Sequence, residues 1–209
     1  MARTRAFDTD DVVQAARDVF WTLGYDAASM PDLERATGLG RSSLYNAFGS
    51  KRGLFDVAVQ SYLDEVVRPR LADVAAASCG ADGLRGYFES IAEAIADGGA
   101  ERQRGCLLLT ASTGRSGQDG EVRAAVEAYR EEVTSAFAAA LQRDLDPERS
   151  DGAAPQDCAA TGPEARVADR ARLLFALLTA GMTLARINTR EAVATLRQAA
   201  GFTGPLALR

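Results

Sequence analysis

The sequence predicts an all-α protein, in which a small N-terminal unit of three helices precedes a larger helical unit. Three observations predict this fold class. Apolar residues recur at spacings of three and four through most of the chain. No segment shows the strict alternation of apolar and polar residues that a half-buried strand requires. Serine, proline and glycine residues within positions 1–52 fall where short helices begin and end.

Length and composition exclude several classes of protein. A chain of 209 residues with 47% hydrophobic residues can bury one large core or two modest ones. Its three cysteines, Cys79, Cys106 and Cys158, form no CxxC pair, which is typical of a reducing cytoplasm. There is no N-terminal apolar run and no apolar stretch of about 18 residues, so neither secretion nor membrane spanning is expected. The predicted location is cytoplasmic.

The net charge of −5 is unevenly placed. Residues 1–52 carry seven basic and seven acidic residues, whereas the remainder carries 17 basic and 22 acidic residues. An acidic protein can therefore still bind nucleic acid, because the basic residues that matter are local to the N-terminal helices.

A first helix is predicted from about Thr9, as its cap, to Leu23, and Gly24 ends it. Trp21 falls off the apolar stripe of this helix and is predicted to be half exposed. The stripe itself consists of Val12, Val13, Ala16, Val19, Phe20 and Leu23.

Two short helices joined by a tight turn are predicted between Ser29 and Phe48. Ser29 is placed to cap the first, and Pro31 lies in its opening turn, where a missing N–H costs nothing. Gly38 can adopt the left-handed conformation that ends a helix. The second helix starts at Arg41 and makes about two turns.

The second short helix has one apolar and one polar face. On a helical wheel Leu44, Ala47 and Phe48 form the buried face. The outward residues are Arg41, Ser42, Ser43, Tyr45 and Asn46. A helix of this length with hydrogen-bonding side chains outward has the size and chemistry to lie in a DNA major groove.

The segment GYDAASMPDLERATGLGRSSLYNAFGSKRGLF resembles the N-terminal domain of the TetR family of bacterial transcriptional regulators. The residues that carry the resemblance are Gly24-Tyr25, Ser29, Gly38, Leu44-Tyr45, Phe48 and Ser50-Lys51. It is specific for roughly the first 60 residues. Two positions depart from the family pattern: Gly40 replaces the usual Ser or Thr cap, and Glu34 replaces a small residue.

The resemblance implies a helix-turn-helix DNA-binding domain at 1–52 and a helical effector-binding and dimerisation domain at 53–209, with about nine helices in all. The expected function is that of a repressor that binds a palindromic operator as a homodimer. Its release from double-stranded DNA would require an apolar or aromatic small-molecule effector. No cofactor and no metal are expected. The expected DNA-binding residues are Arg3, Arg5, Ser29, Arg41, Ser42, Ser43, Tyr45, Asn46, Ser50 and Lys51.

The remaining helices are predicted from periodicity and breakers. Ser50 caps a fourth helix, which Pro69 should kink or interrupt. Further helices are centred on Phe88, Leu108 and Val133, and residues 146–163 are predicted to be loop. A last pair of helices spans about 163–188 and 189–200.

The first helix of this last pair is apolar almost all round, so it is expected to bury two faces, one of them against a second copy. A central core helix in a monomer is the alternative. The expected dimer residues are Leu173, Leu174, Leu177, Leu178, Gly181, Ala185, Val193 and Leu196.

An effector cavity is expected between the middle helices, although each of its residues taken singly is better explained as plain core. The expected lining is Tyr62, Tyr87, Phe88, Ile91, Cys106, Leu109, Tyr129 and Val133. A thiol-based redox sensor that uses Cys106 remains an alternative, with a nearby arginine lowering its pKa.

Two other classes of function fit the sequence less well. An enzyme is not expected, because the chain has no His and shows no nucleophile motif. A helical protein-interaction module without DNA binding is the second alternative, against which the outward Arg41, Tyr45, Asn46 and Lys51 argue.

Overall fold

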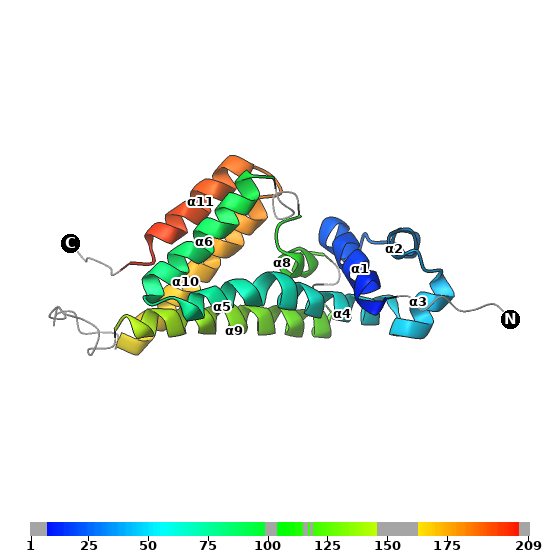
Figure 1. The fold of residues 1–209 in the computed structure, drawn as a ribbon, viewed down its shortest axis with the longest axis horizontal. Helices are drawn as coiled ribbons and strands as arrows, with labels where there is room; N and C mark the ends of the chain where they lie inside the picture. The colour runs from blue at the N-terminus through cyan, green and yellow to red at the C-terminus, as the bar shows by residue number, and fades with distance from the viewer. Residues whose placement is uncertain (1–7, 99–103, 115–116, 118, 146–162, 205–209) are drawn as a thin grey trace. The chain divides into compact units, whose positions relative to one another are not determined.

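The computed structural model describes residues 8–98, 104–114, 117, 119–145 and 163–204 (Figure 1). Every regular element in these ranges is helical, which confirms the all-α prediction. Arg3, Arg5, Cys158 and most of the predicted loop at 146–163 lie outside the described residues. None of the helices described is both long and apolar enough to cross a membrane.

The chain divides into two compact units. The first contains Met1–Arg68 and Cys106–Ala124, and the second contains Pro69–Gly105 and Ala125–Arg209. This division differs from the boundary predicted after Arg52. The reason is that the next helix buries Leu54, Phe55 and Ala58 within the first unit.

The first unit is built on two longer helices, α1 (Thr9–Leu23) and α4 (Lys51–Tyr62), with the short α2 (Met30–Thr37) and α3 (Arg41–Phe48) between them. Another short helix, α8 (Leu107–Ser112), completes the unit. Its core is aromatic: the Phe20 ring lies 5.2 Å from Phe55, and Tyr25 lies 4.8 Å from Phe55, both edge to face. Such pairs add to the free energy of burial.

Two details of α1 differ from the sequence prediction. The cap is Asp8, whose side chain accepts a hydrogen bond from the Asp10 N–H at 3.0 Å, rather than Thr9. Trp21 is only 3% exposed, so its predicted half-exposure is wrong. Its ring packs edge to face on Tyr62 at 4.9 Å, because α4 covers a side of α1 that lies outside the apolar stripe.

The predicted interruption at Pro69 is present as a π-helical turn, η1 (Leu63–Val67), followed by α5 (Arg68–Ala76). Proline has no N–H to donate to the carbonyl four residues earlier. Just before Pro69 the helix changes from α-helical to π-helical hydrogen bonds, which span five residues instead of four. The Arg68 N–H accordingly donates to the Leu63 carbonyl, five residues back.

A charge-assisted hydrogen bond fixes this π turn to α1. The buried Arg17 donates from Nη1 to Glu65 at 2.6 Å and to the Ser61 hydroxyl at 3.0 Å. Gln14 donates to the same carboxylate at 3.0 Å. The hydrogen bond from Arg17 is the main reason that the pKa of Glu65 lies below its ordinary value.

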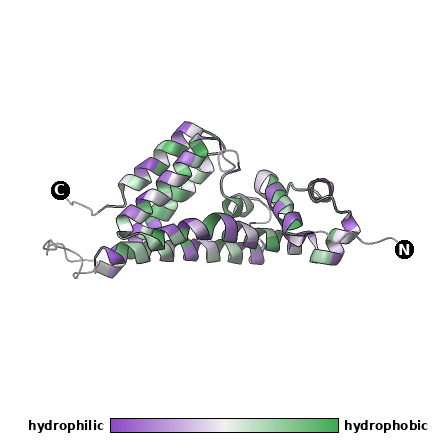
Figure 2. Cartoon of the chain, in the orientation of Figure 1, coloured by the Kyte–Doolittle hydropathy of each residue, from purple (hydrophilic) through white to green (hydrophobic). Residues whose placement is uncertain are grey.

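The second unit contains α6 (Gly80–Ala96), most of α9 (Gly120–Arg143), α10 (Pro163–Leu184) and α11 (Thr189–Gly201). Helices α6, α10 and α11 lie side by side (Figure 1). Green and purple alternate along them in Figure 2, as expected of amphipathic helices. The aromatic part of this core consists of Tyr87, Phe88 and Phe137, with ring centroids 5.2–5.7 Å apart.

Two adjacent residues at the end of α9 hold the α5–α6 turn together. Arg143 donates to the Val74 and Ala75 carbonyls at 2.7 and 2.6 Å, and so satisfies the last turn of α5. Asp144 accepts from the Gly80 and Ala81 N–H groups at 2.7 and 2.6 Å, and so caps α6. A Cβ at Gly80 would lie 1.9 Å from the Ala140 carbonyl oxygen, so only glycine permits this approach.

Replacing Glu65 by Gln should show what the bond to Arg17 contributes. We expect the free energy of unfolding at neutral pH to fall by about 1 kcal/mol, a reduced value because the carboxylate is half exposed. The folded pKa of Glu65 is lowered, so its contribution is complete above the ordinary glutamate pKa and is lost as pH falls through the lowered one.

Urea denaturation of both proteins from neutral pH to below the ordinary glutamate pKa measures this difference. Glu89→Gln, at an exposed position of α6, is the control. A difference between wild type and Glu65→Gln that persists unchanged at low pH would contradict the assignment.

Candidate nucleic-acid interface

Ser29 caps helix α2, as predicted, and forms a complete capping box with Asp32. The Ser29 hydroxyl accepts from the Asp32 N–H at 3.3 Å, and the Asp32 carboxylate accepts from the Ser29 N–H at 3.1 Å. The Ser29 hydroxyl also donates to the Asp32 carboxylate, and this bond, followed by the one from the Ser29 N–H, is the main cause of the lowered pKa of Asp32. Two backbone donors of a helix of only eight residues are thereby satisfied.

The turn between α2 and α3 is fixed by two glycines. Gly38 has a φ of +70° and donates its N–H to the Glu34 carbonyl at 3.0 Å, as a left-handed helix end does. Gly40 is extended, with a φ of −72°, and provides no side-chain cap for α3. The Ser43 and Leu44 N–H groups donate to the Gly40 carbonyl, so the helix is nucleated by backbone bonds alone.

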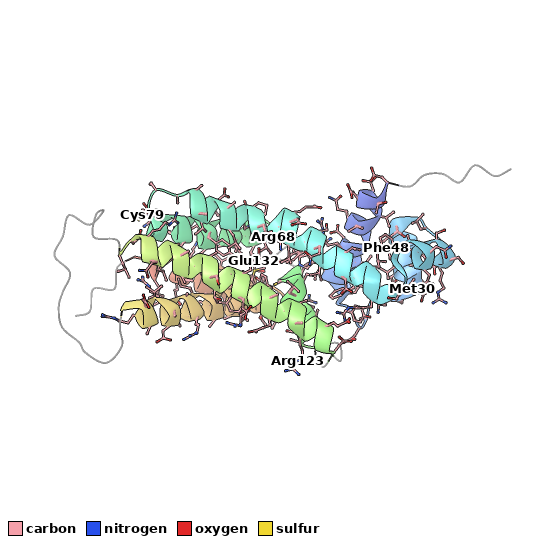
Figure 3. All side chains as sticks on the ribbon, turned by 90° about the horizontal axis from the view of Figure 1, so that it is seen from below. Met30, Phe48, Arg68, Cys79, Arg123 and Glu132 are labelled. Atoms are coloured by element: carbon pink, nitrogen blue, oxygen red, sulfur yellow. The ribbon has the colours of Figure 1, made fainter. Side chains whose placement is uncertain are left out.

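Helix α3 has the predicted bounds and places its polar residues outward. Leu44 is 2% exposed and Phe48 is half buried, but Ala47 is exposed, so its predicted burial is wrong. A two-turn helix at the edge of a unit is covered along one line rather than over a broad face. Figure 3 labels Met30 and Phe48, which begin α2 and end α3. The exposed residues are Arg41, Ser42, Ser43, Tyr45, Asn46 and Ala47.

The start of α4 is held closely against the end of α3. The Ser50 hydroxyl accepts from the Gly53 N–H at 3.0 Å, which confirms Ser50 as the cap. A Cβ at Gly53 would come within 2.1 Å of the Phe48 carbonyl oxygen. The glycine therefore sets how closely α4 can approach α3, and any larger residue would push the two helices apart.

Lys51 is committed to contacts within the chain. Its ammonium donates to the Tyr25 carbonyl at 2.5 Å and lies 4.5 Å from the centroid of the Tyr25 ring. Partial burial lowers its pKa, although Asp26 opposes this. Lys51 therefore ties the segment after α1 to the first turn of α4. The contact between Lys51 and a DNA phosphate is not tested by these distances and stays a prediction.

Arg52 is also occupied within the first unit. Its guanidinium pairs with Asp56 at 2.7 Å, with Asp119 at 3.0 Å and with Glu121 at 3.4 Å. The pKa of Asp119 is lowered, first by the backbone N–H groups of Val122 and Glu121 and then by Arg52. Arg52 therefore joins α4 to the segment that begins α9.

The predicted dimer residues fall into two groups. Leu174, Leu178, Gly181, Ala185 and Leu196 are already buried inside one chain. A Cβ at Gly181 would lie 2.6 Å from the Leu196 Cγ, so these two residues serve the packing of α10 against α11. The others remain accessible: Leu173 is 52% exposed, and Leu177 and Val193 are half buried.

The predicted effector residues are divided between the two units. Tyr62, Cys106 and Leu109 belong to the first unit, and Leu109 is half buried. The others belong to the second unit and are buried in its core: Tyr87, Phe88, Ile91, Tyr129 and Val133. Within that unit Tyr129 also packs edge to face on Phe175 at 5.9 Å. Their role as ligand contacts is not tested by these positions.

Two contacts of the helix-turn-helix were missed by sequence reasoning. One is the bond from Lys51 to Tyr25, although both residues were singled out as part of the family pattern. The other is an ion pair between Glu34 and Arg41, with 3.7 Å between Oε1 and Nε. The unusual carboxylate at position 34, opposite the first residue of α3, was the only sequence signal for it.

Replacing Lys51 by Met should destabilise the protein by about 1–2 kcal/mol, because a charge-assisted bond to a carbonyl and a cation–π contact are lost together. Arg35→Met removes an exposed cation that pairs with Asp32 and is the matched control, with an expected change below about 0.5 kcal/mol. Thermal and urea denaturation measure both. Equal effects of the two variants would show that Tyr25 does not hold Lys51 in solution.

Comparison with known proteins agrees with this geometry. The family model described as "Bacterial regulatory proteins, tetR family" matches residues 12–58. The HTH-type transcriptional regulator YezE of Bacillus subtilis is 31% identical over 146 residues, which are 70% of this chain and 74% of that protein. The HTH-type transcriptional repressor ComR of Escherichia coli is 30% identical over 121 residues, or 57% of each chain.

Solved structures match over almost the whole chain. A cysteine mutant of the TetR family regulator CifR, complexed with 26-bp double-strand operator DNA, has a TM-score of 0.76 and 29% identity. The match covers 95% of this chain and 98% of that one. A TetR family regulator from Agrobacterium tumefaciens, with 22% identity and a TM-score of 0.74 over 92% of this chain and 95% of that one, supports the fold alone.

The capped α2, the left-handed turn at Gly38 and the outward polar face of α3 thus occur in a chain whose relatives are regulators rather than enzymes. The protein belongs to the TetR family of DNA-binding transcriptional regulators.

Proposed function

We propose that this protein represses transcription by binding a palindromic operator as a homodimer, and that a small-molecule effector releases it. The observation that carries the proposal is the exposed polar face of α3, which has five hydrogen-bonding side chains on eight residues. Helix α3 fully buries only Leu44, so packing within the chain accounts for little of its sequence. A DNA major groove offers it both base edges and flanking phosphates.

The residues of this face divide into two roles. Ser42 and Asn46 would contact base edges, since short polar side chains at the centre of the helix reach into the groove. Tyr45 would contact phosphates. Arg41 would contact guanine or a phosphate, and Ser43 a base edge or a phosphate. Ser29 caps α2 and Ser50 caps α4, and the N-terminal amides of these two helices would face the phosphate backbone of the DNA. Arg3 and Arg5 would form an arm outside the described residues.

The homodimer is supported by an apolar strip on α10 and the turn after it. Its members recur at three- and four-residue spacing on the side of α10 opposite the buried residues. They are Leu173, Ala176, Leu177, Ala180, Leu184 and Ile187, of which Ile187 is 78% exposed. A second copy related by a two-fold axis would cover this strip and present two copies of α3 to a palindrome.

Repression and release by an effector are inferred from relatives. ComR and BdcR, a relative 38% identical over 72 residues, are named as repressors. An effector would have to bind a conformation with lower DNA affinity, and the buried aromatic residues Tyr87, Phe88 and Tyr129 would suit an apolar or aromatic ligand. The thiol-sensing alternative is not favoured, because Cys106 is only 2% exposed and an oxidant needs access to the sulfur.

Selection of duplexes from a random library by the full chain should yield a palindrome. Against the selected duplex, Tyr45→Phe should weaken binding to all sequences about equally, because it removes a phosphate contact. Asn46→Ala should instead lose about 1–3 kcal/mol of discrimination at one position of each half-site. Both residues are exposed, so neither change should disturb the fold.

Fluorescence anisotropy with the selected duplex and its single-position variants measures both effects, and circular dichroism checks the fold. Failure to enrich any duplex would reject DNA recognition by α3. An Asn46→Ala variant with unchanged base preference would reject the role of Asn46.

Replacing Leu173 by Arg should convert the dimer into monomers, because two guanidinium groups would be buried when the second copy covers the strip. Leu23→Arg is the matched control, since Leu23 is 45% exposed on α1. Sedimentation velocity at micromolar concentration should give a monomer for the first variant and a dimer for the control. A dimer that survives Leu173→Arg would place the interface elsewhere.

A further inference from the structure

Glu34 and Arg41 form an ion pair within the helix-turn-helix. Glu34 lies in the second half of α2, Arg41 is the first residue of α3, and 3.7 Å separate the carboxylate Oε1 from the guanidinium Nε. Both side chains are partly exposed, at 34% for Glu34 and 59% for Arg41. The pair therefore lies on the surface of the two helices that form the proposed DNA interface.

Arg41 is the cation that pairs with Glu34 in this part of the chain. The other carboxylate of α2, Asp32, is occupied by the Ser29 cap and by Arg35 at 3.1 Å. Helix α3 has no acidic residue in its first turn, and Gly40 gives it no side-chain cap. Glu34 thus brings a negative charge from α2 to the N-terminal residue of α3.

An exposed ion pair of this kind adds little to the stability of the fold. The ion pair has a larger effect on which groups of DNA Arg41 can bind. An unpaired arginine at the start of a recognition helix attracts any nearby phosphate, and every such contact raises affinity for all sequences alike. A carboxylate beside it neutralises part of this attraction and repels phosphates itself.

The ion pair also leaves one end of the guanidinium open. The ion pair is made through Nε, so the two terminal nitrogens of Arg41 remain for a partner in DNA. That end donates two parallel hydrogen bonds, which fit the O6 and N7 acceptors of guanine.

We propose that Glu34 is a positioning residue that makes Arg41 a reader of a guanine edge rather than a general phosphate contact, and so sets the selectivity of the protein for its operator. This inference rests on the proposed operator binding. It assigns a specificity-determining role to a residue that itself touches no DNA.

The experiment measures wild type and Glu34→Gln on two probes: the duplex selected from a random library by the wild-type chain, and a duplex of the same length and scrambled sequence. Asp11→Asn, which removes an exposed carboxylate of α1, controls for the change in net charge. Both variants are also made in an Arg41→Ala background. Binding is measured as a function of salt concentration.

Glu34→Gln should raise affinity for the scrambled duplex by up to about eightfold at 0.1 M salt and steepen its salt slope by about one, as one added phosphate contact does. Affinity for the selected duplex should rise less, so the ratio of the two affinities falls. In the Arg41→Ala background the same change should have only the effect of Asp11→Asn.

Three results would overturn the inference while leaving operator binding intact. They are an unchanged affinity ratio, an effect no larger than that of Asp11→Asn, and an effect that persists without Arg41. A wild-type chain that selects no duplex would instead reject the proposed function itself. Thermal denaturation of each variant separates all of these from a loss of fold.

Discussion

The proposed DNA-binding face depends on how two helices of eight residues are held in place. Isolated helices shorter than about 12–15 residues are marginal in water. Here α2 buries Met30 and Leu33, and α3 fully buries only Leu44. Their positions are therefore imposed from outside, by the aromatic core between α1 and α4 and by contacts at the helix ends. Lys51 is the most direct of these, since it bonds to the segment before α2 from the helix that follows α3.

Helix boundaries were predictable where they depend on local chemistry. Ser29, Gly38 and Ser50 act through their own backbone and the next few residues, so the sequence alone indicates what they do. Burial was less predictable, because it depends on which neighbour covers a face. Trp21 is buried by α4 on a side of α1 that periodicity marks as open, and Ala47 is exposed on a side of α3 that periodicity marks as buried.

The outward residues of α3 were likewise predictable, whereas the partners of long charged side chains were not. Arg52 meets Asp119 across 67 positions, and Lys51 meets Tyr25 across 26, so no local spacing signals either contact. The apolar face of α10 shows a similar division. Composition indicates two buried faces, but only the structure shows that Gly181 packs on Leu196 within the chain while Leu173 stays open.

These contacts would explain how a domain without net positive charge binds an operator selectively, as proposed. Each cation described within residues 8–52 already has a partner in the chain, namely Arg17, Arg35, Arg41, Lys51 and Arg52. A surface of this kind has a weak general attraction for phosphates, so affinity has to come from hydrogen bonds that only some sequences complete. One such interface would be weak. Two of them on the proposed dimer would multiply their selectivity, and so a low electrostatic background and the proposed pairing through α10 would serve the same end.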